Sequence, residues 1–299
     1  MAESTLEWHY ETRHVEVAPG VRDAVDTSPG SAPAFLCVHG LASNARLYDG
    51  VAAHLSEWGY AVASIDQRGH GRSDKPDDGY DFATLTADLV AIMADLVARG
   101  GSGWERPVVL GQSFGGNLVL ELGFRHPELV RGVVCIDGGT IELADSFPDW
   151  DSVREALAPP RLSGMHGDRF ESMIRTAHPD WPEAGVQGTL ANMEVQEDGT
   201  ITPHLSFDHH LAILRGLWQH RPSEIFPVLQ VPALLIPAES PGMDSSFSTA
   251  KRESVSRAIA SNSHTRVQWF SPADHDVHAQ HPAEVAEVLR QAVSEGFFA

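Results

Sequence analysis

The chain contains little cysteine. Only two of its 299 residues are cysteines, Cys37 and Cys135, and both lie in short apolar stretches typical of strands. The sheet predicted below separates these stretches by one strand, so the two residues should lie about 9–10 Å apart. That exceeds the roughly 7 Å between Cα atoms that a disulfide tolerates. We therefore expect two buried free thiols.

Membrane and export signals are also missing. No apolar run approaches the roughly 18 residues of a membrane span. The first ten residues, MAESTLEWHY, lack both the basic and the apolar part of a signal peptide. On these grounds we expect a cytoplasmic protein.

Basic residues are about half as frequent as acidic ones: 21 Lys and Arg stand against 41 Asp and Glu, a formal net charge of −20. Such a chain repels polyanions at long range, which excludes nucleic acid and anionic membrane surfaces as partners. A highly anionic substrate is disfavoured unless the pocket is locally basic. We expect a small neutral or apolar substrate, and a homo-oligomer is compatible with the sequence.

Short apolar segments alternate with helical patterns from about residue 30. This alternation predicts an α/β fold with a mostly parallel eight-stranded sheet and helices on both faces. Parallel strands are expected at 34–38, 61–65, 108–110, 133–136, 233–236 and 267–270. An antiparallel edge hairpin is expected at 14–18 and 21–25. Helices should run from the N-cap Asp81 to Gly100-Gly101, from just after Ser113 to before Pro127, and over about 281–295.

Residues 140–222 interrupt this alternation. The segment is rich in proline, carries Trp150, Trp181 and Trp218, and is too long and too apolar for a bare loop. We expect a small, mostly helical cap between a first core part (1–139) and a second (223–299). The three tryptophans are candidates to line an apolar, substrate-binding roof, and a role in the core of the cap fits them equally well.

The segment Gly111-Gln-Ser-Phe-Gly115 follows a predicted strand and precedes a predicted helix. This is the G-x-S-x-G nucleophile elbow in the strand–turn–helix context that it requires. The turn is so sharp that side chains at the glycine positions would collide with neighbouring backbone. The pattern therefore predicts Ser113 as a nucleophile at the carboxyl end of the sheet.

Two further loops supply partners for such a serine. An oxyanion hole takes the N–H after the nucleophile and one from the loop after the third strand, which predicts Phe114 and Leu41 as donors. The segment Ala273-Asp-His-Asp-Val277 lies between the last strand and the last helix, so His275 is the predicted general base. Metal sites at His275, His278 and His281, or at 208–210, lack a recognisable ligand set. We expect neither metal nor cofactor.

Together these motifs resemble the α/β-hydrolase superfamily, in the branch that includes serine esterases, lactonases and cofactor-free haloperoxidases. The matching stretches are VHGLAS (38–43), DQRGHGRSD (66–74), GQSFGG (111–116) and ADHDVH (273–278). The second resembles the family's loop after the fourth strand, and we expect a structural role for it. Haloalkane dehalogenases and epoxide hydrolases on this fold attack with aspartate, so Ser113 excludes these two activities.

The acid that would complete a catalytic triad with Ser113 and His275 departs from the common pattern of this family. Many family members carry an aspartate after the seventh strand, where this chain has Pro241, with Glu239 nearby. The favoured alternative is Asp137, whose Val-Cys-Ile-Asp context resembles the acid position after the sixth strand in zearalenone-type lactone hydrolases and some haloalkane dehalogenases. If Asp137 has no catalytic role, it would instead cap the turn that follows the strand. Asp244 is a third candidate.

These residues favour hydrolysis of a carboxylic ester or lactone through an acyl-enzyme. A second hypothesis is another acyl or carbon–carbon bond reaction on the same triad, including perhydrolysis. A third is a ligand-binding signalling protein that keeps a hydrolase pocket, because fold does not fix function. The sequence does not identify the substrate.

Overall fold

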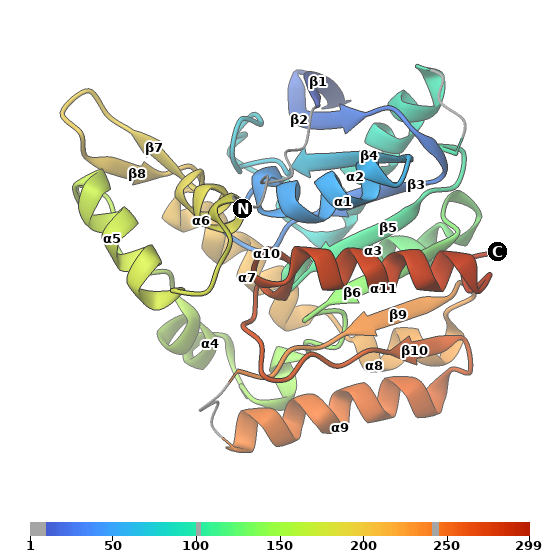
Figure 1. The fold of residues 1–299 in the computed structure, drawn as a ribbon. Helices are drawn as coiled ribbons and strands as arrows, with labels where there is room; N and C mark the ends of the chain where they lie inside the picture. Colours follow the sequence, from blue (N-terminus) through green and yellow to red (C-terminus); the bar gives the residue numbers. More distant parts are fainter. Residues whose placement is uncertain (1–9, 100–102, 241–244) are drawn as a thin grey trace.

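The computed structural model describes residues 10–99, 103–240 and 245–299. Its main sheet has eight strands in the order β1-β2-β4-β3-β5-β6-β9-β10 (Figure 1). The hairpin of β1 (Glu11–Ala18) and β2 (Val21–Ser28) is antiparallel and lies at one edge, and β2 pairs antiparallel with β4. Every other pair is parallel. The predicted fold class is confirmed.

The central parallel strands are mostly buried, as strands covered on both faces should be, whereas only Thr265 is buried in the edge strand at residues 265–267. They are β3 (Ser31–Val38), β4 (Tyr60–Asp66), β5 (Val108–Gln112), β6 (Gly132–Ile136), β9 (Ala233–Ile236) and β10 (Thr265–Val267). The last strand begins earlier than the predicted 267–270. Its ladder with β9 ends where Pro237, which has no N–H, interrupts the pairing. Beyond it Phe270 forms only an isolated bridge with Ala238.

Helices cover both faces of the sheet. On one face α1 (Asp49–Glu57) and α11 (Pro282–Ser294) pack on one buried cluster, which contains Leu55 and Leu289. On the other, α2 (Phe82–Ala98), α3 (Phe114–Arg125) and α9 (Ser245–Ser261) pack on a second. The predicted N-cap is confirmed, since Asp81 accepts a hydrogen bond from the Thr84 amide. The predicted stop at Gly100-Gly101 lies outside the described residues.

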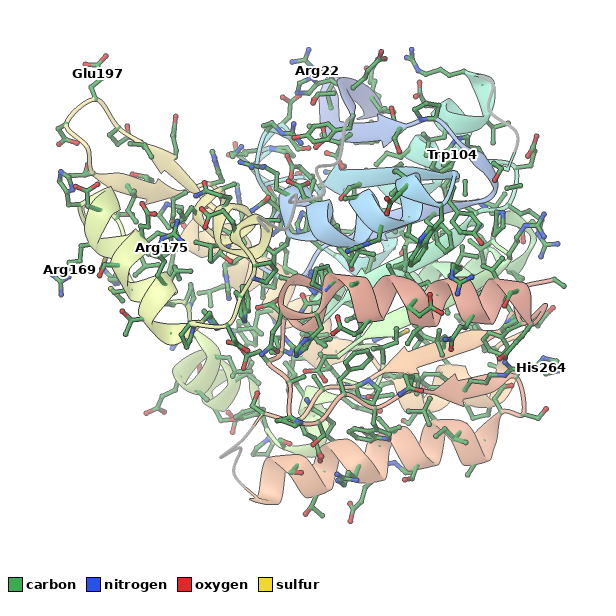
Figure 2. The ribbon with its side chains drawn as sticks, viewed as in Figure 1. Arg22, Trp104, Arg169, Arg175, Glu197 and His264 are labelled. Atoms are coloured by element: carbon green, nitrogen blue, oxygen red, sulfur yellow. The ribbon has the colours of Figure 1, made fainter. Side chains whose placement is uncertain are left out.

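The chain between β6 and β9 adds elements that lie mostly beside the carboxyl ends of the parallel strands, and its last two helices pack against α2 and α3 (Figure 1). These elements are α4 (Trp150–Leu157), α5 (Gly167–Ala177), α6 (Glu183–Leu190), β7 (Met193–Val195), β8 (Ile201–Pro203), α7 (Phe207–Gln219) and α8 (Pro222–Ile225). Arg169 on α5 and Glu197 in the β7–β8 turn lie at its outer end (Figure 2). The β7–β8 hairpin is not foreseen from the sequence.

This group of elements contacts the rest of the molecule at several places, one of them near the loop after β3. There Asn44 donates from its side-chain amide to the Gly188 carbonyl at 2.8 Å.

Within the described ranges, no helix combines the length and apolarity needed to cross a membrane.

Candidate active site

Ser113 occupies the sharp turn between β5 and α3, with φ 54° and ψ −122°. A positive φ is strained for any residue with a Cβ. A Cβ at Gly111 would overlap the Gly115 carbonyl, and a Cβ at Gly115 would overlap the His39 carbonyl. Both glycines are therefore required by close backbone approach. The Ser113 side chain makes no capping hydrogen bond to α3, so the helix does not occupy its hydroxyl.

The end of β6 lies directly against this turn. The Ser113 amide donates to the Ile136 carbonyl at 2.9 Å. Asp137 follows with φ 40°, a second strained residue. A Cβ at Gly138 would overlap the Ser113 carbonyl, so only glycine allows the two turns to approach so closely. This packing fixes Asp137 beside the serine.

Asp137 and His275, which lie far apart in the sequence, form a direct pair. His275 Nδ1 lies 2.6 Å from Asp137 Oδ2. The carboxylate is 2 % exposed and the imidazole 52 %. Because a carboxylate accepts, Nδ1 donates and Nε2 keeps its lone pair toward the open side. Gln112, next to the serine, donates to the His275 carbonyl at 3.3 Å and holds this loop against the elbow.

The charges around the pair shift both pKa values. Burial alone would raise the pKa of Asp137, but its hydrogen bond to His275 and the positive charges of His275 and Lys251 lower it. Desolvation of the ring disfavours its charge, but the hydrogen bond to Asp137 and the carboxylates of Asp276 and Asp137 outweigh this effect. The pKa of His275 is therefore raised above the ordinary 6.5. Asp137 stays ionised and stabilises an imidazolium when one forms.

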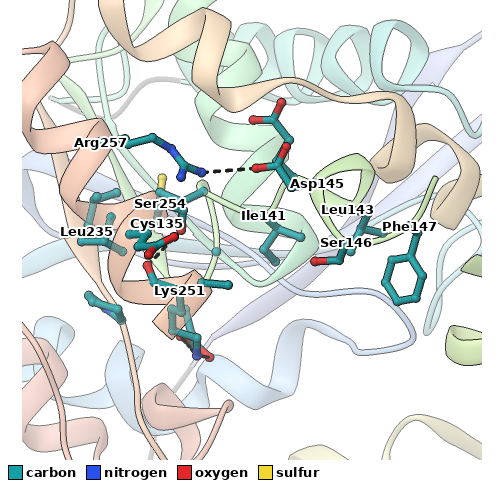
Figure 3. A pocket seen from close by; sticks show the side chains of 18 of the residues that line it. Cys135, Ile141, Leu143, Asp145, Ser146, Phe147, Leu235, Lys251, Ser254 and Arg257 are labelled. Carbon is teal, nitrogen blue, oxygen red and sulfur yellow. Dashed lines mark hydrogen bonds and ion pairs between the residues drawn. The ribbon is translucent and has the colours of Figure 1, made fainter. Parts of the chain in front are cut away.

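Two other groups complete the hydrogen bonding of Asp137. The Ala238 amide donates to Oδ1 at 3.0 Å. Lys251 Nζ lies 2.7 Å from Oδ1 and 2.9 Å from Oδ2 (Figure 3). The sequence does not predict the contact of Lys251 with Asp137, because nothing local to α9 connects it with β6.

Glu239 lies elsewhere. Its carboxylate accepts from Ser248 Oγ at 2.8 Å and from Arg252 Nε at 2.7 Å, and Arg252 Nη2 makes a second close contact. Within the part of the chain that the structure describes, it forms no hydrogen bond with His275. Asp244 and Pro241 lie outside the described residues.

The two predicted oxyanion donors lie on adjacent turns. A Cβ at Gly40, just before Leu41, would lie 3.2 Å from Ser113 Cβ, so the loop after β3 runs close to the serine. Phe114 begins α3 directly after it. Across residues 10–99, 103–240 and 245–299, neither the Leu41 nor the Phe114 amide donates a hydrogen bond. Both N–H groups remain available to a ligand.

The loop after β4 holds the loop after β3 in place. The Ala42 amide (φ 58°) donates to His70 Nε2 at 3.3 Å, while His70 Nδ1 lies 3.0 Å from the Arg68 carbonyl. A carbonyl only accepts, so Nδ1 carries the proton and Nε2 accepts. Burial lowers the pKa of His70 well below its usual range, which keeps the ring neutral. The ring thus stabilises the strained residue next to Leu41.

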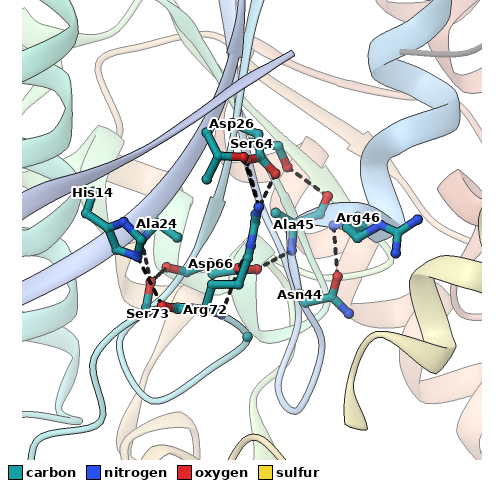
Figure 4. Close-up of polar contacts among 12 residues, drawn as sticks. His14, Ala24, Asp26, Asn44, Ala45, Arg46, Ser64, Asp66, Arg72 and Ser73 are labelled. Atoms are coloured by element: carbon teal, nitrogen blue, oxygen red, sulfur yellow. Dashed lines mark hydrogen bonds and ion pairs between the residues drawn. The ribbon is translucent and has the colours of Figure 1, made fainter. Parts of the chain in front are cut away.

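A network of hydrogen bonds and ion pairs to buried carboxylates also holds the loop after β3 (Figure 4). Buried Asp66 accepts from the Ala45 amide at 2.8 Å and from Arg72 Nε at 2.9 Å. Arg72 also pairs with buried Asp26, at 2.5 Å. The motif at 66–74 therefore joins β2, β4 and the loop after β3.

The three predicted tryptophans occupy different places. Trp181 is buried and donates from Nε1 to Asp274 Oδ2 at 2.9 Å, next to His275. Trp218 donates from Nε1 to the Phe147 carbonyl at 3.1 Å, and its ring centroid lies 6.3 Å from that of Trp150. None of the three is among the residues that line the described cavities. Their substrate-binding role stays a prediction.

Two cavities adjoin the site. One of about 1050 Å³ extends from Ala42 and Ser43 under the chain between β6 and β9. The other, of about 500 Å³, lies between α9 and residues 140–147 and reaches Asp137 (Figure 3). Leu157 at the end of α4 lines both. The first cavity thus reaches the residue after Leu41 and the second reaches Asp137, while Ser113 and His275 are among the described lining residues of neither.

Histidines near the base do not gather into a metal site. His278 is fully buried, packs at 4.5 Å between ring centroids on Tyr48, and has a pKa lowered by burial to about 3. No group of three or more His, Cys, Asp or Glu side chains among the described residues is arranged to hold a metal ion.

Comparison with known proteins adds a second line of evidence. A model of the alpha/beta hydrolase fold family matches residues 33–176, which include the elbow. A 2-(acetamidomethylene)succinate hydrolase of Mesorhizobium japonicum is 33% identical over 137 residues, 46% of each chain. Epoxide hydrolase A of Mycobacterium tuberculosis is 32% identical over 189 residues, 62% of this chain and 53% of that one. The matches thus span about half the length of these relatives.

Likeness in structure extends further along the chain. The crystal structure of E-2-(acetamidomethylene)succinate hydrolase has a TM-score of 0.77 and 22% sequence identity, and the alignment covers 96% of this chain and 100% of that one. At this identity the likeness speaks for the fold alone. The chain therefore has the alpha/beta hydrolase fold, and its residues 33–176, which include the elbow, match the model of that family.

Proposed function

We propose that the protein is a serine hydrolase that cleaves a carboxylic ester or lactone through an acyl-enzyme. The observation that supports this most is the 2.6 Å hydrogen bond between His275 Nδ1 and Asp137, beside the Ser113 elbow. A serine, a histidine in a fixed tautomer and a buried carboxylate form the arrangement that activates a hydroxyl for acyl transfer.

In the proposed reaction His275 Nε2 accepts the Ser113 proton as Oγ attacks the acyl carbonyl. The resulting oxyanion accepts hydrogen bonds from the Leu41 and Phe114 amides, each worth about 3–4 kcal/mol of barrier. Asp137 holds the imidazole tautomer and stabilises the imidazolium.

His275 then donates its proton to the leaving alkoxide, which departs as an alcohol. In the second half-reaction His275 takes a proton from water, the hydroxide attacks the acyl-enzyme, and Ser113 is released with its proton restored. All groups that move protons belong to the chain, so the proposed cycle needs no cofactor.

The larger cavity carries little charge. Arg161 is the one formally charged side chain among its described lining residues, and its guanidinium lies 5.7 Å from the centre of the Phe207 ring. His210 has a pKa lowered by burial to about 4, so it is neutral at pH 7. A single cation cannot balance two carboxylates, so we favour a bulky neutral ester or lactone over the dicarboxylate named for the Mesorhizobium relative.

Active-site labelling tests the proposal. A fluorophosphonate should add once to the protein, and Ser113→Ala should abolish both the adduct and the turnover of p-nitrophenyl esters. Ser152→Ala on α4 is the matched control and should keep both. Labelling that survives in Ser113→Ala would contradict the assignment. Binding without any turnover would favour a ligand-binding protein, and mass spectrometry of the products would identify carbon–carbon cleavage.

A further inference from the structure

The ammonium group of Lys251 lies against the acid of the proposed triad. Its Nζ contacts both oxygens of Asp137, at 2.7 and 2.9 Å, and the Ala238 carbonyl at 2.8 Å. An ammonium has three donors, and these three acceptors use them all. The Lys251 side chain is 22 % exposed, so the pair is only partly solvated.

The other cations of α9 face different carboxylates. Arg252 binds Glu239. Arg257 lies 3.3 Å from Asp145, and more than half of each of these two side chains is exposed. Lys251 is thus the α9 cation that contacts Asp137. Its contact spans 114 residues of sequence and joins α9 to the end of β6.

Lys251 shares the carboxylate with the catalytic base. Asp137 Oδ2 accepts from both His275 Nδ1 and Lys251, while Oδ1 accepts from Lys251 and the Ala238 amide. Without Lys251 the carboxylate would keep one backbone donor besides the imidazole. Rotation about its Cβ–Cγ bond would then be restrained much less.

Resting on the proposed function, we propose that Lys251 is a positioning residue for the catalytic base. It fixes the carboxylate of Asp137 at the distance where His275 donates to it. Its positive charge also opposes the charge that His275 acquires as it takes the serine proton. Lys251 touches neither serine nor substrate in this role and acts through Asp137.

The charges that face His275 determine the sign of the effect. Asp137, at the end of β6, and Asp276, next to His275 in its loop, favour the imidazolium. Lys251, on α9, disfavours it. Asp274, beside the base, is bound by His178 and Trp181. His278 on α10 is neutral at pH 7. Lys251 is therefore the cation that offsets the surrounding carboxylates, and its loss should favour protonated His275.

The test is the pH dependence of fluorophosphonate labelling, which requires neutral His275. Lys251→Met should move the acid limb upward by about half a pH unit and lower the plateau rate roughly tenfold. Lys251→Arg keeps the charge and should leave the limb in place. Arg266→Met removes the same charge from an exposed ion pair with Glu295, away from the described cavities, and should change neither limb nor plateau.

Each outcome decides between the alternatives. An acid limb of folded Lys251→Met that coincides with that of Arg266→Met would overturn the positioning role and leave the proposed function intact. No labelling of the unaltered protein would overturn both. Circular dichroism and thermal unfolding check the fold. If the methionine variant does not fold, Lys251→Gln, which keeps a donor without the charge, is compared with Lys251→Arg by the same criterion.

Discussion

The carboxyl edge of the sheet and the chain between β6 and β9 are packed very differently. At the edge, α3 buries ten consecutive residues, Phe114 to Gly123. In the other region α4 buries only Val153 and α5 only Phe170. The first is enclosed by sheet and helices, whereas the other residues of α4 and α5 are partly or fully exposed to solvent.

This difference separates two kinds of contribution. Residues at the edge are positioned by backbone contacts so close that glycine is required, as between Gly138 and Ser113. A change there should alter the chemical step for every substrate. The other region supplies side chains around a large cavity, so changes there should act on the remote parts of a substrate and differ between substrates.

The sharpest test of the edge is Asp137→Asn. The amide cannot replace the carboxylate toward His275 Nδ1 and should stabilise the wrong tautomer. We expect a loss in kcat near 10⁴-fold, as for the equivalent change in a serine protease. The acid limb should also move down, because Asp137 raises the pKa of His275. Steady-state kinetics on p-nitrophenyl esters gives both values.

Glu239→Gln is the matched control for this variant. Glu239 binds Arg252 and Ser248, and among the described residues it forms no hydrogen bond with His275. We expect a change in kcat below about threefold. Equal losses in the two variants would show that both carboxylates reach the ring, and the reverse pattern would make Glu239 the acid.

The pH profile tests the same edge without a mutation. The proposed base works when neutral, and its pKa is raised, so the acid limb of kcat/KM should lie above 6.5. Below that limb activity should fall about tenfold per pH unit, or roughly a hundredfold over two units. A limb below 6.5 in a folded enzyme would show that Asp137 and Asp276 do not dominate the charge around His275.

Trp181→Ala tests the boundary between the two regions. Trp181 packs with Leu47, Val186 and Ala279 and bonds to Asp274, so its loss should shift the loop that carries His275. We expect a roughly tenfold loss in kcat/KM that is uniform across esters, and a loss in unfolding free energy of about 3–5 kcal/mol. Losses confined to bulky esters would place Trp181 among the substrate contacts instead.

Trp218→Ala tests the chain between β6 and β9 alone. Its indole bonds to the Phe147 carbonyl, and Phe147 lines the smaller cavity. We expect a change of about threefold in the ratio of kcat/KM for bulky and acetate esters, with little change for acetates. A uniform change for all esters would remove the proposed distinction between the two regions.

The sequence predicts the edge well because its signals are local. The apolar strands and the spacing of the glycines around Ser113 each lie within a few residues, and the hairpin of β1 and β2 surrounds Pro19-Gly20. The fold class and the edge position of the hairpin follow from them. The contact between Asp137 and His275 is suggested only by resemblance, because a second carboxylate, Glu239, follows the neighbouring strand.

Long-range contacts are what the sequence does not show. Lys251 lies in a charged helical stretch, Ala-Lys-Arg-Glu, that is indistinguishable from an ordinary solvated face. The strands β7 and β8 have three residues each, too few for a period of two to be recognised. Trp181 is recognisable as important to its segment, but its partner Asp274 is 93 residues away.

The hydrogen bond between Asp137 and His275 also has a consequence for folding. It closes a loop of 138 residues, which contains everything from α4 to β10. Helices form locally and early, whereas contacts between such distant residues wait for the intervening chain to be ordered. On refolding from denaturant, esterase activity should therefore return later than the helical circular dichroism signal, and simultaneous recovery would contradict this order. Catalysis would then report the last tertiary contacts to form, and partly folded chains would be inactive despite their secondary structure.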